Sequence, residues 1–203
     1  SGKGTQAKFV SSALKIAHIS TGDILRDEVK KATELGLRIK EVIDRGEFVP
    51  DSMIAEIVET AVQSSYASKG YILDGFPRTI EQAVILDDML GRLGMDKPLV
   101  ISLVVPDDII VERLSKRRVC GSCGSNVALP GESHDEACPI CGTIGNFTKR
   151  KDDDEAVVRK RLEVFHSLTS PVLDFYEKRG QVIIIDGTGD VEKITRDILA
   201  GLS

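Results

Sequence analysis

The sequence predicts an α/β protein built on a parallel sheet with helices on both faces. Short apolar runs alternate with amphipathic stretches, and three of the four runs are almost continuous Val, Ile and Leu. Strands of that composition are typical of sheets covered on both faces, and strand–helix alternation implies parallel pairing. Residues 116–153 interrupt the pattern, since they are rich in Gly, Ser and Cys and show little periodicity. We expect them to form a separate insertion.

The expected elements follow from these periodicities. Predicted strands occupy residues 16–20, 71–74, 99–105 and 182–186. Predicted helices occupy residues 5–14, 23–45 with a break near Gly36, 51–67, 79–93, 107–115, 155–179 and 191–202. A chain of 203 residues is long enough for one well-packed domain with an excursion.

Composition narrows the functional classes. Charged residues make up 29% of the chain and the formal net charge is -5, so we expect a soluble protein. A net negative charge argues against non-specific binding of nucleic acid over a broad surface. No apolar run approaches the roughly 18 residues that span a membrane.

The chain opens with "SGKGTQAKF", which has the form of the second half of a phosphate-binding loop. In such loops backbone N–H groups cradle phosphates and the lysine reaches the terminal ones. Gly2, Lys3 and Thr5 fit that pattern, but no leading glycine or apolar strand precedes them. On these residues alone the signal is weak, and a glycine-rich helix start is the better explanation of the segment.

All four cysteines lie in the insertion, as Cys120-x2-Cys123 and, fourteen residues later, Cys138-x2-Cys141. Two such knuckles place four thiolates within reach of one tetrahedral Zn²⁺. Two disulfides or four free thiols are the alternatives. A zinc held by four cysteines would be structural, since no coordination position stays open.

Two polar motifs follow predicted strands, where ligands bind in open α/β sheets. "DGFPRT" begins at Asp74 and offers an acid for a metal's water shell and Arg78 for a phosphate. A plain turn with a surface arginine is the alternative. "STGD" begins at Ser20, and simple helix N-capping explains it as well. Arginines also gather on both sides of the insertion, which suits a lid over polyphosphate but is equally common on solvated helices.

Taken together, these motifs resemble bacterial adenylate kinases of the long-lid form with a zinc-bearing lid. The resemblance runs in register from Ser1 to Leu202 through "SGKGT", "STGDILR", "DGFPRT", "VERLSKRR" and "RKDD". It implies a parallel-sheet P-loop nucleoside monophosphate kinase core. Family members read G-x-P-G-x-G-K-G-T about ten residues into the chain. The resemblance therefore implies that the first, central strand and the front of the loop would precede Ser1.

The resemblance assigns roles residue by residue. It implies catalytic roles for Lys3, Asp74, Arg78, Arg117, Arg150 and Arg161, with Asp74 organising Mg²⁺ through water. It implies ATP contacts from Ser1, Gly2, Lys3, Gly4, Thr5, Arg113, Arg117, Asn126, Val127 and Gly189. It implies AMP contacts from Thr21, Arg26, Glu47, Phe48, Val49, Gly75, Phe76, Pro77, Arg78, Gln82, Arg150 and Arg161. Gln82 would read the AMP adenine, and Arg113 would stack on the ATP adenine.

The expected organisation is a core of residues 1–20, 50–115 and 154–203, an AMP-binding segment of residues 21–49 and a zinc lid of residues 116–153. The implied reaction is MgATP + AMP ⇌ 2 ADP, which serves adenine nucleotide homeostasis. We expect a cytoplasmic monomer with no nucleic-acid or membrane partner. A UMP/CMP-type kinase is the nearer alternative, although such relatives usually read S-A-G-D where this chain has Thr21. A zinc-ribbon nucleic-acid-binding protein explains only the cysteines.

Overall fold

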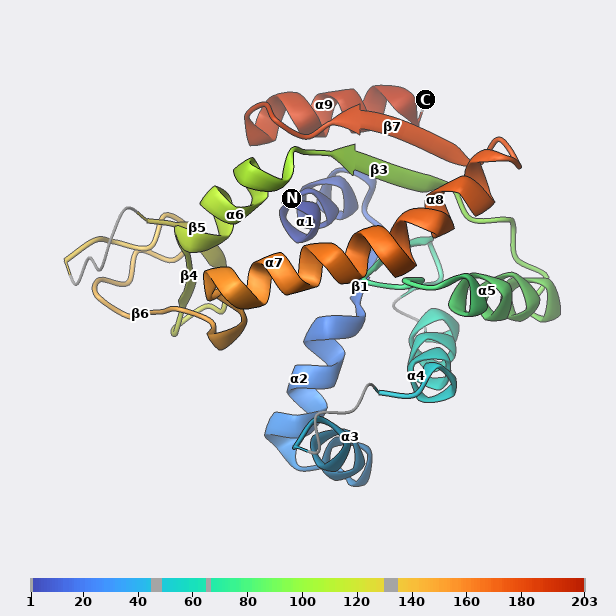
Figure 1. The fold of residues 1–203 in the computed structure, drawn as a ribbon, viewed down its shortest axis with the longest axis horizontal. Helices are drawn as coiled ribbons and strands as arrows, with labels where there is room; N and C mark the ends of the chain where they lie inside the picture. The colour runs from blue at the N-terminus through green and yellow to red at the C-terminus, as the bar shows by residue number, and fades with distance from the viewer. Residues whose placement is uncertain (1, 45–48, 65–66, 130–134, 203) are drawn as a thin grey trace.

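The computed structural model describes residues 2–44, 49–64, 67–129 and 135–202. A central α/β core carries two projections (Figure 1): the helices α2 and α3, and the small sheet that contains β4, β5 and β6. The described part of the chain contains no helix long and apolar enough to cross a membrane.

The core strands pair in parallel, as predicted. The strand β1 (Ala17–Ser20) pairs with β2 (Tyr71–Asp74), and β3 (Val100–Val104) pairs with β7 (Val182–Asp186). Among the described residues the two pairs are not hydrogen-bonded to each other, although both contribute to one apolar cluster. The strand that would precede Ser1 lies outside this chain and stays a prediction.

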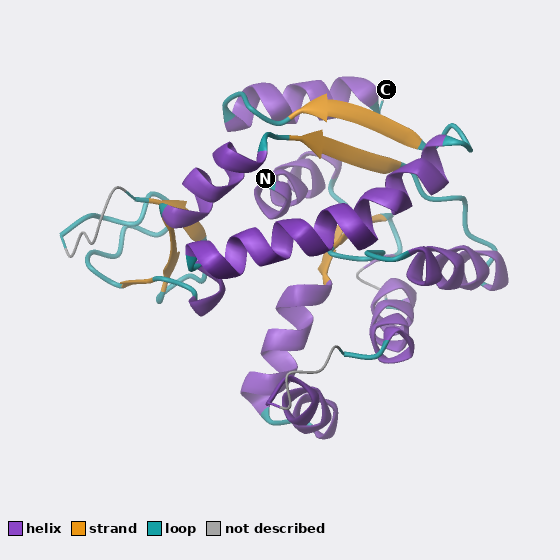
Figure 2. Ribbon diagram, viewed as in Figure 1, coloured by secondary structure: helices purple, strands orange, loops and turns teal. Residues whose placement is uncertain are grey.

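Helices cover both faces of these strands (Figure 2). On one face, α1 (Lys3–Leu14) and α9 (Val191–Gly201) pack against β2, β3 and β7. On the other, α4 (Asp51–Gln63) and α5 (Ile80–Arg92) cover β1 and β2, and α8 (Ser170–Glu177) covers β3 and β7. This two-sided covering confirms the predicted fold class.

The long helix expected over residues 23–45 is two helices, α2 (Thr21–Lys31) and α3 (Glu34–Asp44). The predicted break near Gly36 is wrong, because the chain turns at Ala32, whose φ is 51°. Gly36 lies inside α3, where a Cβ would come within 2.0 Å of the Glu28 carbonyl oxygen. Glycine is needed there for close packing of α3 on the end of α2, and not for a turn.

The helix predicted over residues 155–179 is also interrupted. It consists of α7 (Glu155–Val164), a π turn at Phe165–Thr169 and α8. Pro171 has no N–H for the carbonyl four residues earlier, so the turn before it cannot keep the regular α pattern.

The insertion is better ordered than its lack of periodicity predicts. It follows α6 (Asp107–Ser115) and forms an antiparallel sheet in the order β5-β4-β6. The strands are β4 (Arg117–Cys120), β5 (Asn126–Ala128) and β6 (Phe147–Thr148), and the turn Lys151–Asp153 leads back to α7. Short strands of two to four residues carry too little alternation to be recognised in a sequence.

Candidate active site

The centre of the candidate site is the carboxylate of Asp74, at the carboxyl end of β2. Lys3, at the first position of α1, forms an ion pair with one of its oxygens, and His18 Nε2 lies 3.3 Å from the other. The backbone at Gly2 is left-handed, with φ at 90°, and α1 begins there. The free N–H groups and the dipole at a helix start favour anions, so the site combines an anion cradle with an anchored acid.

The surroundings of Asp74 keep it ionised. Burial alone would raise the pKa of this carboxyl, which is only 9% exposed. The hydrogen bond to His18 and the charge and hydrogen bond of Lys3 outweigh that effect and hold the pKa far below its usual range. An acid that stays charged in a nearly buried position can attract a hydrated cation.

The turn after β2 brings three of the predicted AMP-binding residues together. Thr21 Oγ1 donates a hydrogen bond of 3.3 Å to the Asp74 carbonyl, and Arg78 Nε donates one of 2.8 Å to the Gly75 carbonyl. The φ of Gly75 is 91°, and a Cβ there would lie 2.8 Å from Thr21 Oγ1. Only glycine allows this approach. The ring of Phe76 packs in the core, so an AMP contact from this residue would come from its backbone.

Five arginines from different parts of the chain lie close enough to repel their neighbours. Desolvation lowers the pKa of Arg78, and the charges of Arg161 and Arg26 lower it further. Desolvation also lowers the pKa of Arg150, and the charges of Arg117 and Arg26 add to that shift. A concentration of cations that stay protonated in proteins is unfavourable until an anion neutralises it. The arginines predicted to clamp phosphate are therefore neighbours in space.

Acids and amides hold these arginines in place. Arg117 makes a two-pronged ion pair with Asp153, including a bond of 2.8 Å from Nε. Arg161 reaches the Asp152 carboxylate at 2.9 Å, and Arg150 donates to Asn126 Oδ1 at 3.0 Å. This hydrogen bond connects the start of β5, at Asn126, to Arg150 at the end of the insertion.

The Arg117–Asp153 pair should carry much of the stability at the base of the lid, because the Asp153 side chain has no exposed surface. We expect Asp153→Ala to lower the free energy of unfolding by about 3–5 kcal/mol, since it leaves a mostly buried guanidinium unpaired. Urea denaturation measures the change. Asp152→Ala removes the half-exposed pair with Arg161 and should cost at most about 1 kcal/mol. Equal costs for the two variants would contradict this assignment.

Gln82 lies on the first turn of α5, next to the Arg78 turn. Its side chain is 4% exposed and accepts a 2.7 Å hydrogen bond from the Arg78 backbone N–H. Val49 packs with α2, α3 and α4 in the apolar cluster of the α2–α3 projection. The predicted residues Ser1, Glu47 and Phe48 lie outside the described residues.

The residues predicted to contact the ATP base also converge. Arg113, on α6, donates hydrogen bonds of 2.7 Å to the Gly187 carbonyl and 3.0 Å to the Thr188 carbonyl. Gly189 follows in the same loop. The guanidinium plane is therefore fixed beside the backbone that was predicted to touch the base. Val127 is buried in the lid core and Asn126 is exposed next to Arg150.

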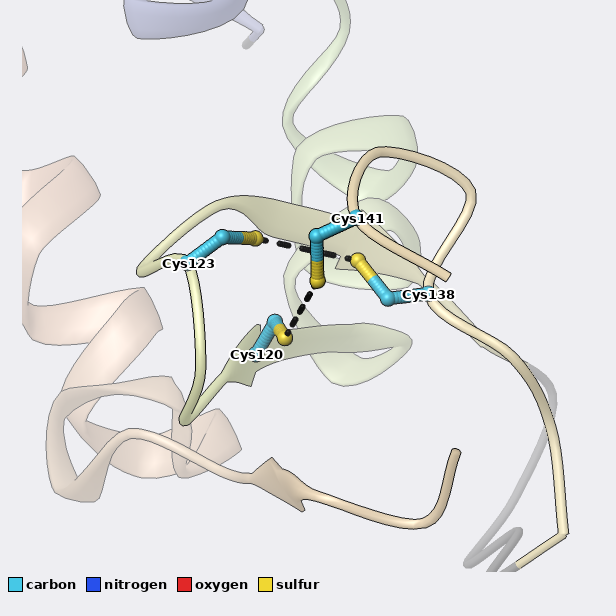
Figure 3. A group of neighbouring side chains, drawn as sticks. All are labelled: Cys120, Cys123, Cys138 and Cys141. Carbon is cyan, nitrogen blue, oxygen red and sulfur yellow. Dashed lines mark hydrogen bonds between the residues drawn. The ribbon is translucent and has the colours of Figure 1, made fainter. Parts of the chain in front are cut away.

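The sulfur atoms of the four cysteines gather where they are placed to hold one metal ion (Figure 3). Their sulfur atoms all lie within 4.8 Å of one another, with 3.7 Å between Cys120 and Cys141 and 3.8 Å between Cys123 and Cys138. A tetrahedron with Zn–S bonds of about 2.3 Å has edges of about 3.8 Å, whereas a disulfide would need about 2 Å. The spacing fits four thiolates around one ion and excludes the predicted alternative of two disulfides.

The two knuckles have the same backbone geometry. Gly124 N–H donates to the Cys120 carbonyl and Gly142 N–H to the Cys138 carbonyl, both at 2.8 Å, with φ of 69° and 73° at the two glycines. Hydrogen bonds from the side chain and backbone of Ser125 lower the pKa of Cys123 to about 6. A thiol that is ionised near neutral pH is a ready metal ligand.

Sequence reasoning missed three residues that serve the site: His18, Asp51 and Asp153. His18 could have been found from the alternation of side chains along β1. His18 and Ser20 point to the same face of the strand, and Ser20 pairs with Asp74. A polar residue between Ala17 and Ile19, which are both buried, indicates a face that meets the site. Asp51 and Asp153 gave no signal of this kind.

A helix start suited to phosphate, an acid after β2 and an arginine cluster beside an insertion with four clustered cysteines are typical of P-loop nucleoside monophosphate kinases. Comparison with known proteins narrows the class. The family model described as adenylate kinase matches residues 1–181, and the chain belongs to the adenylate kinase family.

Curated relatives agree. The chain is 43% identical to an adenylate kinase of Caldicellulosiruptor bescii over 203 residues, which are 99% of this chain and 94% of the relative. It is 44% identical to an adenylate kinase of Kosmotoga olearia over 203 residues, with the same shares covered. It is also 44% identical to one of Archaeoglobus fulgidus over 201 residues, which are 98% of this chain and 92% of the relative. The predicted family, fold class and enzyme activity are confirmed.

Proposed function

We propose that this adenylate kinase transfers the γ-phosphoryl group of MgATP to AMP with the residues assembled around Asp74. The convergence of Arg26, Arg78, Arg117, Arg150 and Arg161 carries the proposal. Mutual repulsion among these cations is relieved when the triphosphate of ATP and the phosphate of AMP lie between them. Phosphoryl transfer demands mainly positioning and charge neutralisation, and this arrangement supplies both.

Lys3 and Asp74 bind the phosphates and the Mg²⁺ of MgATP. The α1 N–H groups and the Lys3 ammonium hold the β- and γ-phosphates. Asp74 fits Mg²⁺ because it offers hard carboxylate oxygens that stay ionised beside the phosphate cradle. When bound, the ion neutralises phosphate charge. Arg113 and Gly189 hold the ATP base, and Asn126 and Val127 bring the lid to the nucleotide.

The turn after β2 binds AMP. Arg78 and Arg26 hold the AMP phosphate, and Thr21 and Gly75 line the same place. An oxygen of that phosphate attacks the γ-phosphorus of ATP, the bond from the γ-phosphorus to the β,γ-bridging oxygen breaks, and ADP leaves with the electron pair. No side chain is required as a nucleophile. Arg117, Arg150 and Arg161 stabilise the charge that spreads over the transferring group.

The remaining assignments concern organisation and surroundings. We propose that residues 21–49 bind AMP, that residues 116–153 form the lid and that the lid holds one structural zinc. The ordinary acidic surface supports a monomer in the cytoplasm that uses neither nucleic acid nor a membrane as partner.

Turnover of MgATP with AMP, UMP, CMP and GMP tests the proposal. AMP should give a kcat/KM at least about 100-fold above UMP, because a base site built on hydrogen bonds rejects a base with the wrong donors and acceptors. A preference for UMP or CMP would favour the UMP/CMP-type alternative.

A further inference from the structure

Asp51 links α4 to the residue that is expected to read the AMP base. It occupies the first position of α4, after Pro50. Its Oδ1 accepts a 2.7 Å hydrogen bond from Gln82 Nε2, and its Oδ2 lies 3.4 Å from Thr79 Oγ1. The helices α4 and α5 pack against each other, so the contact is supported on both sides.

The partners of Gln82 determine which way its amide points. The backbone N–H of Arg78 can only donate, so the amide atom 2.7 Å from it must be the oxygen Oε1. An ionised Asp51 can only accept, so the atom facing it must be Nε2. If the amide were flipped, its NH2 group would face the Arg78 N–H and its oxygen would face the Asp51 carboxylate, and both contacts would be repulsive. The orientation therefore follows from chemistry and has two independent supports.

We propose that Asp51 is a positioning residue that sets the base preference of the monophosphate site. Among the contacts of the described residues, each amide atom of Gln82 uses one bond, which leaves one lone pair on Oε1 and one N–H on Nε2. That pair of groups, acceptor beside donor, matches a base edge that carries an amine beside a ring nitrogen. Adenine has this edge, and cytosine has it too. Guanine and uracil present a carbonyl beside an N–H, which is the reverse polarity.

The inference deepens the proposed function and rests on it, because it takes Gln82 as the base reader. It adds that Asp51 fixes the orientation of the Gln82 amide. Among the hydrogen bonds of the described residues, removing Asp51 leaves only the one from the Arg78 N–H to hold the orientation of the Gln82 amide. Loss of one such bond corresponds to about a tenfold change in an equilibrium constant. The loss should fall on bases of adenine polarity and not on bases of guanine polarity.

The test measures binding of AMP, CMP, GMP and UMP by calorimetry without ATP, in the intact protein and in variants. Asp51→Ala should weaken AMP and CMP about tenfold and leave GMP and UMP unchanged or tighter, so that the AMP:GMP ratio falls at least tenfold. Asp51→Asn keeps an acceptor and should stay within about threefold of the parent ratio. Asp51→Ser is the second variant, because serine suits a helix start but is too short to reach Gln82.

Glu59→Ala is the matched control. Glu59 also joins α4 to α5, through an ion pair of 3.1 Å with Arg92, but it lies about two turns beyond Asp51 along α4. This variant loosens the same helix pair and should leave the AMP:GMP ratio unchanged. Turnover adds a second readout, with each nucleotide varied in turn while the other is saturating. Asp51→Ala should raise KM for AMP while KM for ATP stays the same.

The outcomes separate cleanly. Equal weakening of all four monophosphates in Asp51→Ala and Asp51→Ser overturns the proposal, as does an unchanged AMP:GMP ratio or a Glu59→Ala ratio that falls equally. Failure of the parent protein to phosphorylate AMP would instead refute the proposed function. The two failures are distinguishable because the binding ratios are measured without turnover.

Discussion

Replacing Lys3 by alanine is expected to lower kcat by about 100- to 1,000-fold while the fold survives. The ammonium lies at the first turn of α1, where the Asp74 carboxylate holds it beside the expected γ-phosphate. Its charge acts mostly on the transition state, in which negative charge spreads over the transferring oxygens. Loss of one such donor typically costs a factor of that size. Steady-state kinetics with saturating MgATP and AMP measure it.

Two further variants sharpen this test. Lys8→Ala removes an exposed charge from the same helix and should leave kcat unchanged. Lys3→Arg keeps the positive charge beside Asp74 but replaces a compact ammonium with a planar fork, so it should keep the melting temperature and still lose most of the activity. A kcat for Lys3→Ala within about threefold of the parent would show that Lys3 does not contact the transferring group.

The parts of the site that could be predicted from the sequence are those encoded by local spacing. Two C-x-x-C knuckles restrict four sulfurs to one small volume, and the structure indeed brings Cys120 and Cys141 to 3.7 Å. Strands of continuous Val and Ile were placed to within one residue at each end, because burial on both faces leaves few other compositions. Helix ends were less certain, as the turn at Ala32 illustrates. A residue without a special backbone preference gives no warning that it will adopt a left-handed conformation.

What could not be predicted is which acid each cation or amide meets. Asp51 and Gln82 are 31 positions apart, and Arg117 and Asp153 are 36 apart. Their meeting depends on how α4 docks on α5 and how the lid sheet closes, which no local period encodes. Residues 151–154 include three consecutive acids, and only the fold shows that Asp153 is buried while Asp152 stays half exposed. Their different roles are a consequence of tertiary register.

Removing the metal from the lid is expected to destabilise the lid far more than it impairs the chemistry. In the described part of the lid, the apolar core consists of Cys120, Val127, Leu129 and Cys138, with Phe147 packed beside them. Ile140 and Ile144 are each 66% exposed. So small a cluster cannot offset the ordering entropy of the segment. Four thiolates around one zinc would supply the deficit, because binding to a site that the unfolded chain lacks is itself folding free energy.

Cys138→Ala should therefore release the metal and lower the melting temperature by about 10 °C or more, on the scale of 2–4 °C per kcal/mol for a chain of this size. Amide hydrogen exchange should accelerate in β4, β5 and β6 before it does in β3 or β7. Metal analysis should give one zinc per parent chain and none in the variant. Ser122→Ala alters the other knuckle, between Cys120 and Cys123, without removing a ligand and should keep both the zinc and the melting temperature.

Activity at low temperature should fall much less than stability, because all four coordination positions are thiolates and none is open for an activated water. The Arg117–Asp153 pair also anchors the base of the lid independently of the metal. Arg150 also lies at the base of the lid. Arg117 and Arg150 can therefore still reach the phosphates when the cysteine knuckles have lost their metal. Complete loss of activity in a metal-free sample that far-UV dichroism and slow exchange in β3 and β7 show to be folded would mean that the metal shapes the active site directly. A metal-free sample with an unchanged melting temperature would mean that the lid is held by its protein contacts alone.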